Sequence, residues 1–244
     1  MPTVRTGPAI GLAAQAALLA LLTATAGLGR AGWTSGAAYG VIVCFTLTWG
    51  LHRTATTVLG PADWVTLGRA VLTGGVTALI VESFLRSIAV PVLVAITTVA
   101  LVLDWVDGQV ARRTRTSSEL GARFDMEVDA FLILVLCVYV AQQVGAWVLA
   151  IGAMRYAFVA SSWMLRWMRV RLPDRYWRKV VAALQGVVLT VAASGVLPAV
   201  WATVALAGAL ALLVESFGRD VLWLYKRQRL YQHQPTVCEQ PARQ

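Results

Sequence analysis

The sequence is short of charged residues. Only 14% of its 244 residues are Asp, Glu, Lys or Arg, whereas soluble globular domains usually carry about 25%. Hydrophobic residues make up 58% of the chain, and the mean hydropathy is +0.68. This composition excludes an ordinary water-soluble fold and indicates a protein whose apolar helices cross a membrane several times.

Cysteine and histidine are also scarce. The chain has three cysteines and two histidines, without a CxxC pair or the Cys/His spacing of a zinc site. Cys44 and Cys137 lie inside apolar runs, whereas Cys238 lies in a polar C-terminal stretch. The sequence therefore supports neither a disulfide framework nor a zinc centre.

The charge balance is positive, with 21 Lys and Arg against 12 Asp and Glu, a net charge of +9. The basic residues gather at the ends of apolar runs, which is typical of the cytoplasmic loops of membrane proteins. A nucleic-acid-binding protein usually carries them along one soluble face. We therefore expect contacts with anionic membrane lipids and no nucleic-acid partner.

Eight apolar stretches predict eight transmembrane helices, each of which needs roughly 17–25 residues. The first one could be a signal peptide, but its length favours a retained span. The segment Pro61–Arg69 is expected to lie at the interface before the third span, with Trp64 at the level of the headgroups. The predicted spans are 8–28, 35–52, 69–85, 88–110, 121–143, 146–168, 179–197 and 199–218.

These spans predict an all-α, polytopic membrane helix bundle in three parts. Residues 1–59 would form two accessory transmembrane helices, residues 60–220 a six-helix catalytic core, and residues 221–244 a polar cytoplasmic tail. With the amino terminus inside, most basic residues face the cytoplasm and only Arg30 and Arg86 face outwards. We therefore expect an integral, multi-pass cell membrane protein with both termini and residues 104–129 on the cytoplasmic side.

Acidic residues cluster in the stretch 103–130, LDWVDGQVARRTRTSSELGARFDMEVDA. Asp104 and Asp107 are three residues apart, and Asp125 and Asp129 are four apart, so each pair shares one face of a helix. The polar residues between the two pairs are turn formers, which predicts that the two helices are antiparallel neighbours. The four carboxylates are therefore expected to converge on one site.

Four converging carboxylates repel one another unless positive charge is present. Mg²⁺ and Mn²⁺ prefer oxygen ligands, and Mg²⁺ usually keeps phosphate oxygens in its coordination shell. The residues thus predict a divalent metal site that also binds phosphate, and a pair of ions fits this chemistry. Gly108 and Ala111 lack bulk and would let a nucleotide approach the helix, where Arg112 could pair with a phosphate oxygen. Gly121 would allow close approach of the helices.

The spacing of these residues matches a family signature at all eight defined positions. The pattern D-x2-D-G-x2-A-R-x8-G-x3-D-x3-D begins at Asp104 and ends at Asp129. It resembles the signature of the CDP-alcohol phosphotransferases, also called CDP-alcohol phosphatidyltransferases. The resemblance implies a phosphotransferase of phospholipid biosynthesis that moves a phosphatidyl group from a CDP-alcohol, in the first place CDP-diacylglycerol, to an acceptor hydroxyl and releases CMP.

The resemblance also implies roles for individual residues and a homodimer, which is common among such enzymes. Asp129 would be the general base. The stretch Val65–Arg69 resembles a segment that often opens the first core helix, which implies nucleotide contacts for Asp63 and Thr66. The metal ligands would be Asp104, Asp107, Asp125 and Asp129, and the nucleotide would contact Asp104, Gly108, Ala111, Arg112, Gly121 and Thr66.

Three basic residues are candidates for binding the acceptor. Arg155 lies inside the sixth predicted span, where an arginine is a functional candidate, or else a structural partner of Glu82, Glu215 or a motif carboxylate. Arg178 and Lys179 open the seventh span and could hold the phosphate of a phosphorylated acceptor, or merely flank the membrane on its cytoplasmic side.

Glycerol 3-phosphate, inositol phosphate, serine or another lipid would all fit as the acceptor. Relatives that use glycerol phosphate often have proline after the third aspartate of the motif, where this chain has Met126. A second class of function is a cation or proton transporter that uses the same carboxylates. The predicted position of the acids at one membrane face, rather than along a path at the midplane, favours the enzyme.

Overall fold

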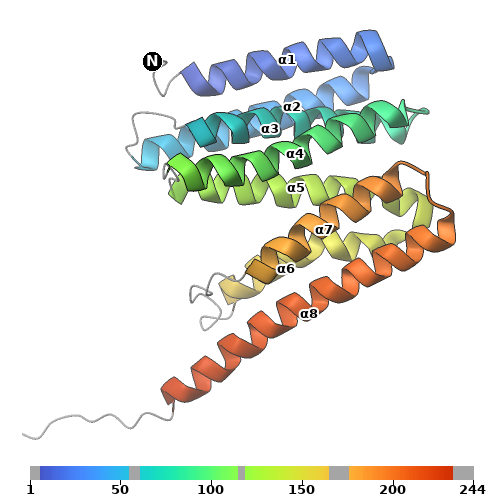
Figure 1. Ribbon diagram of the computed structural model, residues 1–244. Helices are drawn as coiled ribbons and strands as arrows, with labels where there is room; N and C mark the ends of the chain where they lie inside the picture. The colour runs from blue at the N-terminus through green and yellow to red at the C-terminus, as the bar shows by residue number, and fades with distance from the viewer. Residues whose placement is uncertain (1–5, 55–60, 115–118, 165–175, 233–244) are drawn as a thin grey trace, which may run out of the picture.

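The computed structural model describes residues 6–54, 61–114, 119–164 and 176–232. These ranges contain eight α-helices, one short 3₁₀ turn and no strand, which confirms the predicted all-α, polytopic membrane bundle. The helices run alternately in opposite directions (Figure 1). Their bounds are α1 Thr6–Ala26, α2 Arg30–Thr54, α3 Pro61–Ser83, α4 Val90–Thr114, α5 Glu119–Val144, α6 Leu149–Met164, α7 Tyr176–Ala193 and α8 Ala199–Gln232, with the 3₁₀ turn η1 at Ala146–Val148.

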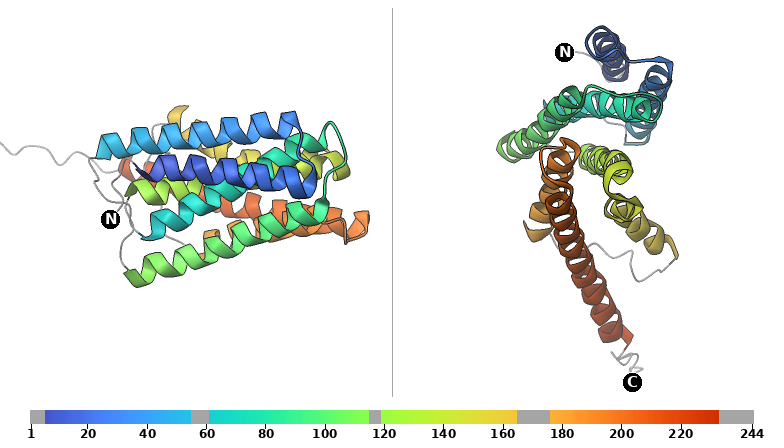
Figure 2. Two further views of the ribbon diagram at one scale, coloured as in Figure 1. Left: turned by 90° about the horizontal axis from the view of Figure 1, so that it is seen from above. Right: turned by 90° about the vertical axis from the view of Figure 1, so that its right-hand side faces the viewer.

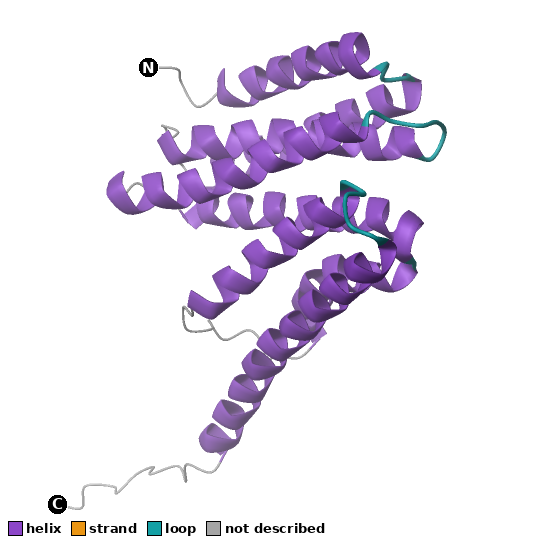
Figure 3. Cartoon of the chain, turned by 45° about the vertical axis from the view of Figure 1, so that its right-hand side comes forward, coloured by secondary structure: helices purple, strands orange, loops and turns teal. Residues whose placement is uncertain are grey.

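Four of the described helices, α1, α2, α3 and α8, are long and apolar enough to cross a membrane. Shorter apolar helical stretches cover Val90–Val106 and Ala146–Ser161. Each of the eight predicted spans corresponds to one helix, because lipid offers no partner for backbone N–H and C=O groups and each span must pair them internally. The described connections 27–29, 84–89, 145–148 and 194–198 lie at one end of the bundle (Figure 3).

Helix α3 occupies the centre of the first half of the bundle, where it packs against α1, α2, α4 and α5. Helix α5 also packs against α6 and α7, and α7 packs against α8. Buried core residues of α3 and α5 include Val76, Leu79, Leu136 and Val140. The two central helices thus connect α1 and α2 with α6, α7 and α8 (Figure 2).

Close helix contacts depend on glycine at two interfaces. A Cβ atom on Gly152 of α6 would lie 2.7 Å from the Cα atom of Leu134 in α5. A Cβ atom on Gly32 of α2 would lie 2.9 Å from the carbonyl oxygen of Ala78 in α3. Helix association in lipid depends on van der Waals packing, so small residues that let backbones touch hold these pairs together.

Helices α1 and α2 are attached to the end of α3. The buried carboxylate of Glu82 accepts a hydrogen bond of 2.8 Å from the backbone N–H of Gly32, in the first turn of α2. Glu82 also forms an ion pair with Arg86. In turn, Nη1 of Arg86 donates a 3.3 Å hydrogen bond to the carbonyl of Gly27, in the turn between α1 and α2.

One sequence-based expectation is changed by the structure. Residues 61–69 are not a separate interfacial piece, because they form the first turns of α3, and Trp64 packs beside Leu47, Leu51 and Leu67. The helix can continue through Arg69 because acids from α4 and α5 neutralise this buried charge. Helix α8 extends beyond the other helices (Figure 1) and runs through the expected boundary between core and tail after residue 220, and the division of the chain into these parts stays a prediction.

Candidate metal centre

Three of the four motif aspartates meet at one point. Asp104 of α4 and Asp125 and Asp129 of α5 each place a carboxylate oxygen within 4.8 Å of the others. Asp125 and Asp129 share one face of α5 because they are four residues apart. All three side chains are partly exposed, at 40%, 29% and 37% respectively. The predicted convergence of these three carboxylates is therefore present in the structure.

The helices that carry the acids do not form the neighbouring pair that the sequence predicts. Among the described residues, α4 and α5 each pack against α3 and α7, while no extensive contact joins α4 directly to α5. The acids meet across α3 instead. The side chain that joins them therefore comes from α3.

That side chain is Arg69, which is 1% exposed. Its Nη1 lies 3.1 Å from Oδ1 of Asp104 and also pairs with Oδ1 of Asp125. Its Nη2 pairs with Oδ1 of Asp129. A guanidinium group keeps its charge at any physiological pH, and its fork of N–H donors can serve several carboxylates at once. Arg69 is thus the cationic centre of the cluster.

The charge of this cluster fits a divalent cation. When ionised, Asp104, Asp125 and Asp129 carry three negative charges, of which Arg69 balances one. Two negative charges remain, equal to the charge carried by one Mg²⁺ or Mn²⁺. Carboxylate oxygens are the ligands that such hard cations prefer, at about 2.0–2.1 Å for Mg²⁺. Oxygens already within 4.8 Å of one another need only small shifts to surround an ion.

The remaining motif residues are seen only in part. Asp107, Ala111 and Arg112 belong to α4, but their side chains lie outside the described part of the structure. Gly108 on α4 and Gly121 on α5 are both partly buried. The predicted roles of these five residues remain predictions.

Thr66 is buried and lies three residues before Arg69, on the same side of α3. Thr73, one turn after Arg69, donates a 2.9 Å hydrogen bond to the backbone carbonyl of Arg69. The side of α3 that faces the acids therefore carries buried polar residues within its membrane-spanning stretch. A nucleotide contact for Thr66 stays a prediction, as does one for Asp63.

The three basic residues that were candidates for binding the acceptor are not among the contacts of the carboxylate cluster that the structure describes. Arg155 of α6 donates a 2.8 Å hydrogen bond to Glu127. Glu127 was not among the expected partners of Arg155. Of the two glutamates that were expected, Glu82 pairs with Arg86 and Glu215 pairs with Arg219. Glu127 is two residues from both Asp125 and Asp129, hence about 200° away from each around α5. The observed contact of Arg155 is therefore on another face of α5.

Arg178 lies at the start of α7, where its Nη1 is 3.4 Å from Oδ2 of the buried Asp220 in α8. Lys179, the next residue, is exposed. Trp177 also contacts α8, through a 3.2 Å hydrogen bond from Nε1 to Glu215. This end of α7 is therefore a polar junction with α8, and the acceptor role of Arg178 and Lys179 remains a prediction.

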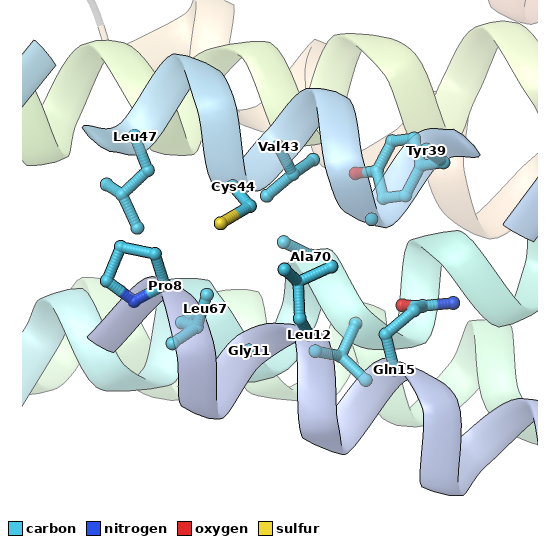
Figure 4. A pocket seen from close by; sticks show the side chains of 12 residues that line it. Pro8, Gly11, Leu12, Gln15, Tyr39, Val43, Cys44, Leu47, Leu67 and Ala70 are labelled. Atoms are coloured by element: carbon cyan, nitrogen blue, oxygen red, sulfur yellow. The ribbon is translucent and has the colours of Figure 1, made fainter. Parts of the chain in front are cut away.

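A pocket lies on a different face of α3, between α1, α2 and α3 (Figure 4). Leu67 and Ala70 line it from α3, while Gln15 and Tyr39 supply its polar groups. None of its twelve lining residues is charged. The pocket therefore offers no group to neutralise a phosphate, and the carboxylate cluster is the better candidate for the functional site.

A membrane helix bundle that gathers three carboxylates around a buried arginine has the donor set of a divalent metal centre. The family model described as CDP-alcohol phosphatidyltransferase matches residues 59–214, more than half of the chain. The chain belongs to this family, whose members are transferases of substituted phosphate groups acting on CDP-alcohols. Comparison with curated proteins and with solved structures finds no match.

The matched region contains every residue of the cluster but begins after α2. Sequence reasoning found the three acids and missed Arg69 as their partner. A signal was present, because Arg69 stands in an apolar helix only three residues after Thr66, and a charged residue at membrane depth usually has a function. Its partners could not be read from the sequence, since they come from two other helices.

Proposed function

We propose that this protein transfers a phosphatidyl group from CDP-diacylglycerol to the hydroxyl of a small alcohol or phosphorylated polyol and releases CMP, as a step of phospholipid biosynthesis. The convergence of Asp104, Asp125 and Asp129 is the observation that carries this proposal. Membership of the CDP-alcohol phosphatidyltransferase family supports the type of donor and the type of reaction. The apolar helices support a donor that resides in the membrane.

The metal ligands in this proposal are Asp104, Asp125 and Asp129, with Asp107 as the fourth ligand named by the motif. A divalent ion held there would neutralise the charge that develops on the phosphate oxygens during transfer. One or two ions of Mg²⁺ or Mn²⁺ fit the acidic donor set.

The chain's own residues would perform the proton transfer. Asp129 accepts the proton of the acceptor hydroxyl, as a general base. The hydroxyl oxygen forms a bond to the phosphorus that bears the lipid alcohol, and the bond from that phosphorus to the bridging oxygen of CMP breaks. CMP leaves with the bonding electrons. Arg112, Gly108, Ala111, Gly121 and Thr66 would hold the CDP group during this exchange.

The acceptor would approach from the side of α7, where Arg178 and Lys179 offer positive charge to a phosphorylated acceptor. Arg155 is a further candidate for this role. We also propose that residues 1–59 are an accessory unit, residues 60–220 the catalytic core and residues 221–244 a polar tail, with the site and both termini on the cytoplasmic side of the cell membrane. The positive charge around these segments supports this orientation.

An acceptor screen tests the proposal directly. Purified protein in detergent or nanodiscs would be given CDP-diacylglycerol, Mg²⁺ or Mn²⁺, and one acceptor at a time: glycerol 3-phosphate, inositol phosphate or serine. Release of CMP that requires both metal and one acceptor is the expected result. Absence of CMP release with every acceptor, together with metal-driven ion flux in proteoliposomes, would instead favour a transporter.

A further inference from the structure

The arginine at the centre of the carboxylate cluster has an unusual environment. Arg69 is 1% exposed, so its charge has almost no contact with solvent or lipid. Among the described residues, its charged partners are three aspartates, and each of them is paired through its Oδ1 atom. The same three aspartates each place a carboxylate oxygen within 4.8 Å of the others, close enough to hold one metal ion. Arg69 and a divalent ion would therefore compete for the same carboxylates.

On this basis, and resting on the metal site of the proposed function, we propose that Arg69 is an internal counter-cation of the cluster. Arg69 holds the carboxylates together when no metal is bound. When a divalent ion binds, Arg69 loses some of its contacts with the carboxylate oxygens and then requires a new anionic partner. The diphosphate of a CDP-alcohol is an anion suited to that need. Arg69 is therefore a positioning residue that couples metal binding to substrate binding.

The physical reason lies in the burial of the guanidinium. Arginine cannot lose its proton to escape an unfavourable environment. A buried cation that loses its carboxylates to a divalent ion is left beside like charge with little solvent to screen it. Anionic phosphate oxygens relieve this repulsion, and they bind a guanidinium in fork geometry. Metal alone is thus opposed by Arg69, whereas metal together with a diphosphate is not.

A spare donor of Arg69 agrees with this role. Its Nε atom is buried and has no hydrogen-bond partner among the described residues. Buried donors are usually satisfied, and an unsatisfied one is costly. A phosphate oxygen would supply the acceptor that Nε lacks.

Metal binding without turnover is the measurement that tests the proposal. The dissociation constant of Mn²⁺ would be measured by electron paramagnetic resonance on purified protein, with and without CDP as a soluble diphosphate probe. For the unmodified protein, we expect CDP to tighten Mn²⁺ binding by about 5–150-fold, the usual range of coupling between two sites. For Arg69→Gln, we expect tighter Mn²⁺ binding in the absence of CDP and a smaller effect of CDP.

Two further variants keep the test decisive. Arg69→Lys retains one charge but lacks the fork that serves several carboxylates, so its Mn²⁺ affinity should lie between those of the unmodified protein and Arg69→Gln. It also serves if Arg69→Gln does not fold. Arg86→Gln is the matched control, since Arg86 is paired with the carboxylate of Glu82, outside this cluster. Its Mn²⁺ affinity and its response to CDP should not change.

Thermal unfolding in EDTA distinguishes the counter-cation role of Arg69 from a purely structural role. Arg69→Gln should lower the midpoint in EDTA, and Mn²⁺ should restore it by a larger shift than in the unmodified protein. If Arg69→Gln binds Mn²⁺ no more tightly than the unmodified protein, Arg69 does not compete with metal and the proposal is overturned. If the unmodified protein itself binds no Mn²⁺, the metal site of the proposed function fails, and this inference fails with it.

Discussion

Glu82 near the end of α3 and Gly32 in the first turn of α2 are joined by a 2.8 Å hydrogen bond from backbone N–H to carboxylate. A carboxylate at this position satisfies a helix N-terminal N–H group and interacts favourably with the positive end of the helix dipole. Helix α2 lies outside the matched region of the family, but this contact and the hydrogen bond from Arg86 to the carbonyl of Gly27 attach it to the end of α3. The helix pair α1–α2 is therefore an integral part of the bundle.

Glu82→Gln should weaken this attachment. The substitution keeps the shape of the side chain but removes the charge that pairs with Arg86, and we expect a loss of roughly 1–3 kcal/mol in the free energy of unfolding. Glu215→Gln is the matched control, because Glu215 also pairs with an arginine four residues later, but its side chain is 36% exposed. Exposed pairs contribute about 0–1 kcal/mol. The measurement is unfolding of both variants in detergent. Equal losses of stability would contradict the role of Glu82 in attaching α2 to α3.

Asp129→Asn should remove the general base. We expect CMP release from CDP-diacylglycerol to fall by at least about 100-fold, the lower end of the usual contribution of a general base. Glu127→Gln provides the comparison, because Glu127 lies on the same helix and contacts Arg155 rather than the cluster. That variant should retain most of the activity. Comparable losses in the two variants would argue that Asp129 has only a general structural role.

Removal of divalent metal should abolish CMP release and reduce stability. Addition of Mg²⁺ or Mn²⁺ at 100 times the dissociation constant should raise the free energy of unfolding by about 2.7 kcal/mol, because only the folded protein has the assembled site. Asp104→Asn and Asp125→Asn should lose most of this gain. A metal-induced stabilisation of the same size in these variants would place the ion elsewhere.

Gly152→Ala should force α5 and α6 apart. The added Cβ atom meets the backbone of Leu134 at 2.7 Å, and overpacking of this kind usually costs about 1–3 kcal/mol. Gly208→Ala in α8 is the control, since no atom lies within 4 Å of the added Cβ. Thermal unfolding of the two variants should separate them clearly. Equal midpoints would mean that the α5–α6 contact tolerates expansion.

Much of the fold could be predicted because the rules for lipid-embedded helices act on local sequence. Each apolar run long enough to span a membrane must be helical, and each predicted span has its helix. Helix ends were less predictable. Residues 61–69 were expected at the interface, with Trp64 at the level of the headgroups. The partners that allow the charge of Arg69 to be buried are 35 to 60 residues away in sequence.

The candidate site was predictable to a similar extent. The spacing of Asp125 and Asp129 fixes them on one helix face, and this relation needs no tertiary information. The relation of Asp104 to this pair was inferred from a direct contact between two helices, whereas α3 in fact lies between them and contributes to the cluster. The contacts of Arg155 and Arg178 could not be predicted from the sequence either, because each depends on which helix packs beside α6 or α7.

The sequence by itself determined that the chain forms apolar helices, that acidic residues occur at helical spacing, and that the family signature is complete. These are properties of single segments, set by hydropathy and by the helical repeat. Only the tertiary structure decided that Arg69 joins the acids from α4 and α5, and that Glu82 receives the start of α2. The reason is that a buried charge pairs with the groups that lie near it in space, and helix packing brings together residues that are far apart in the sequence.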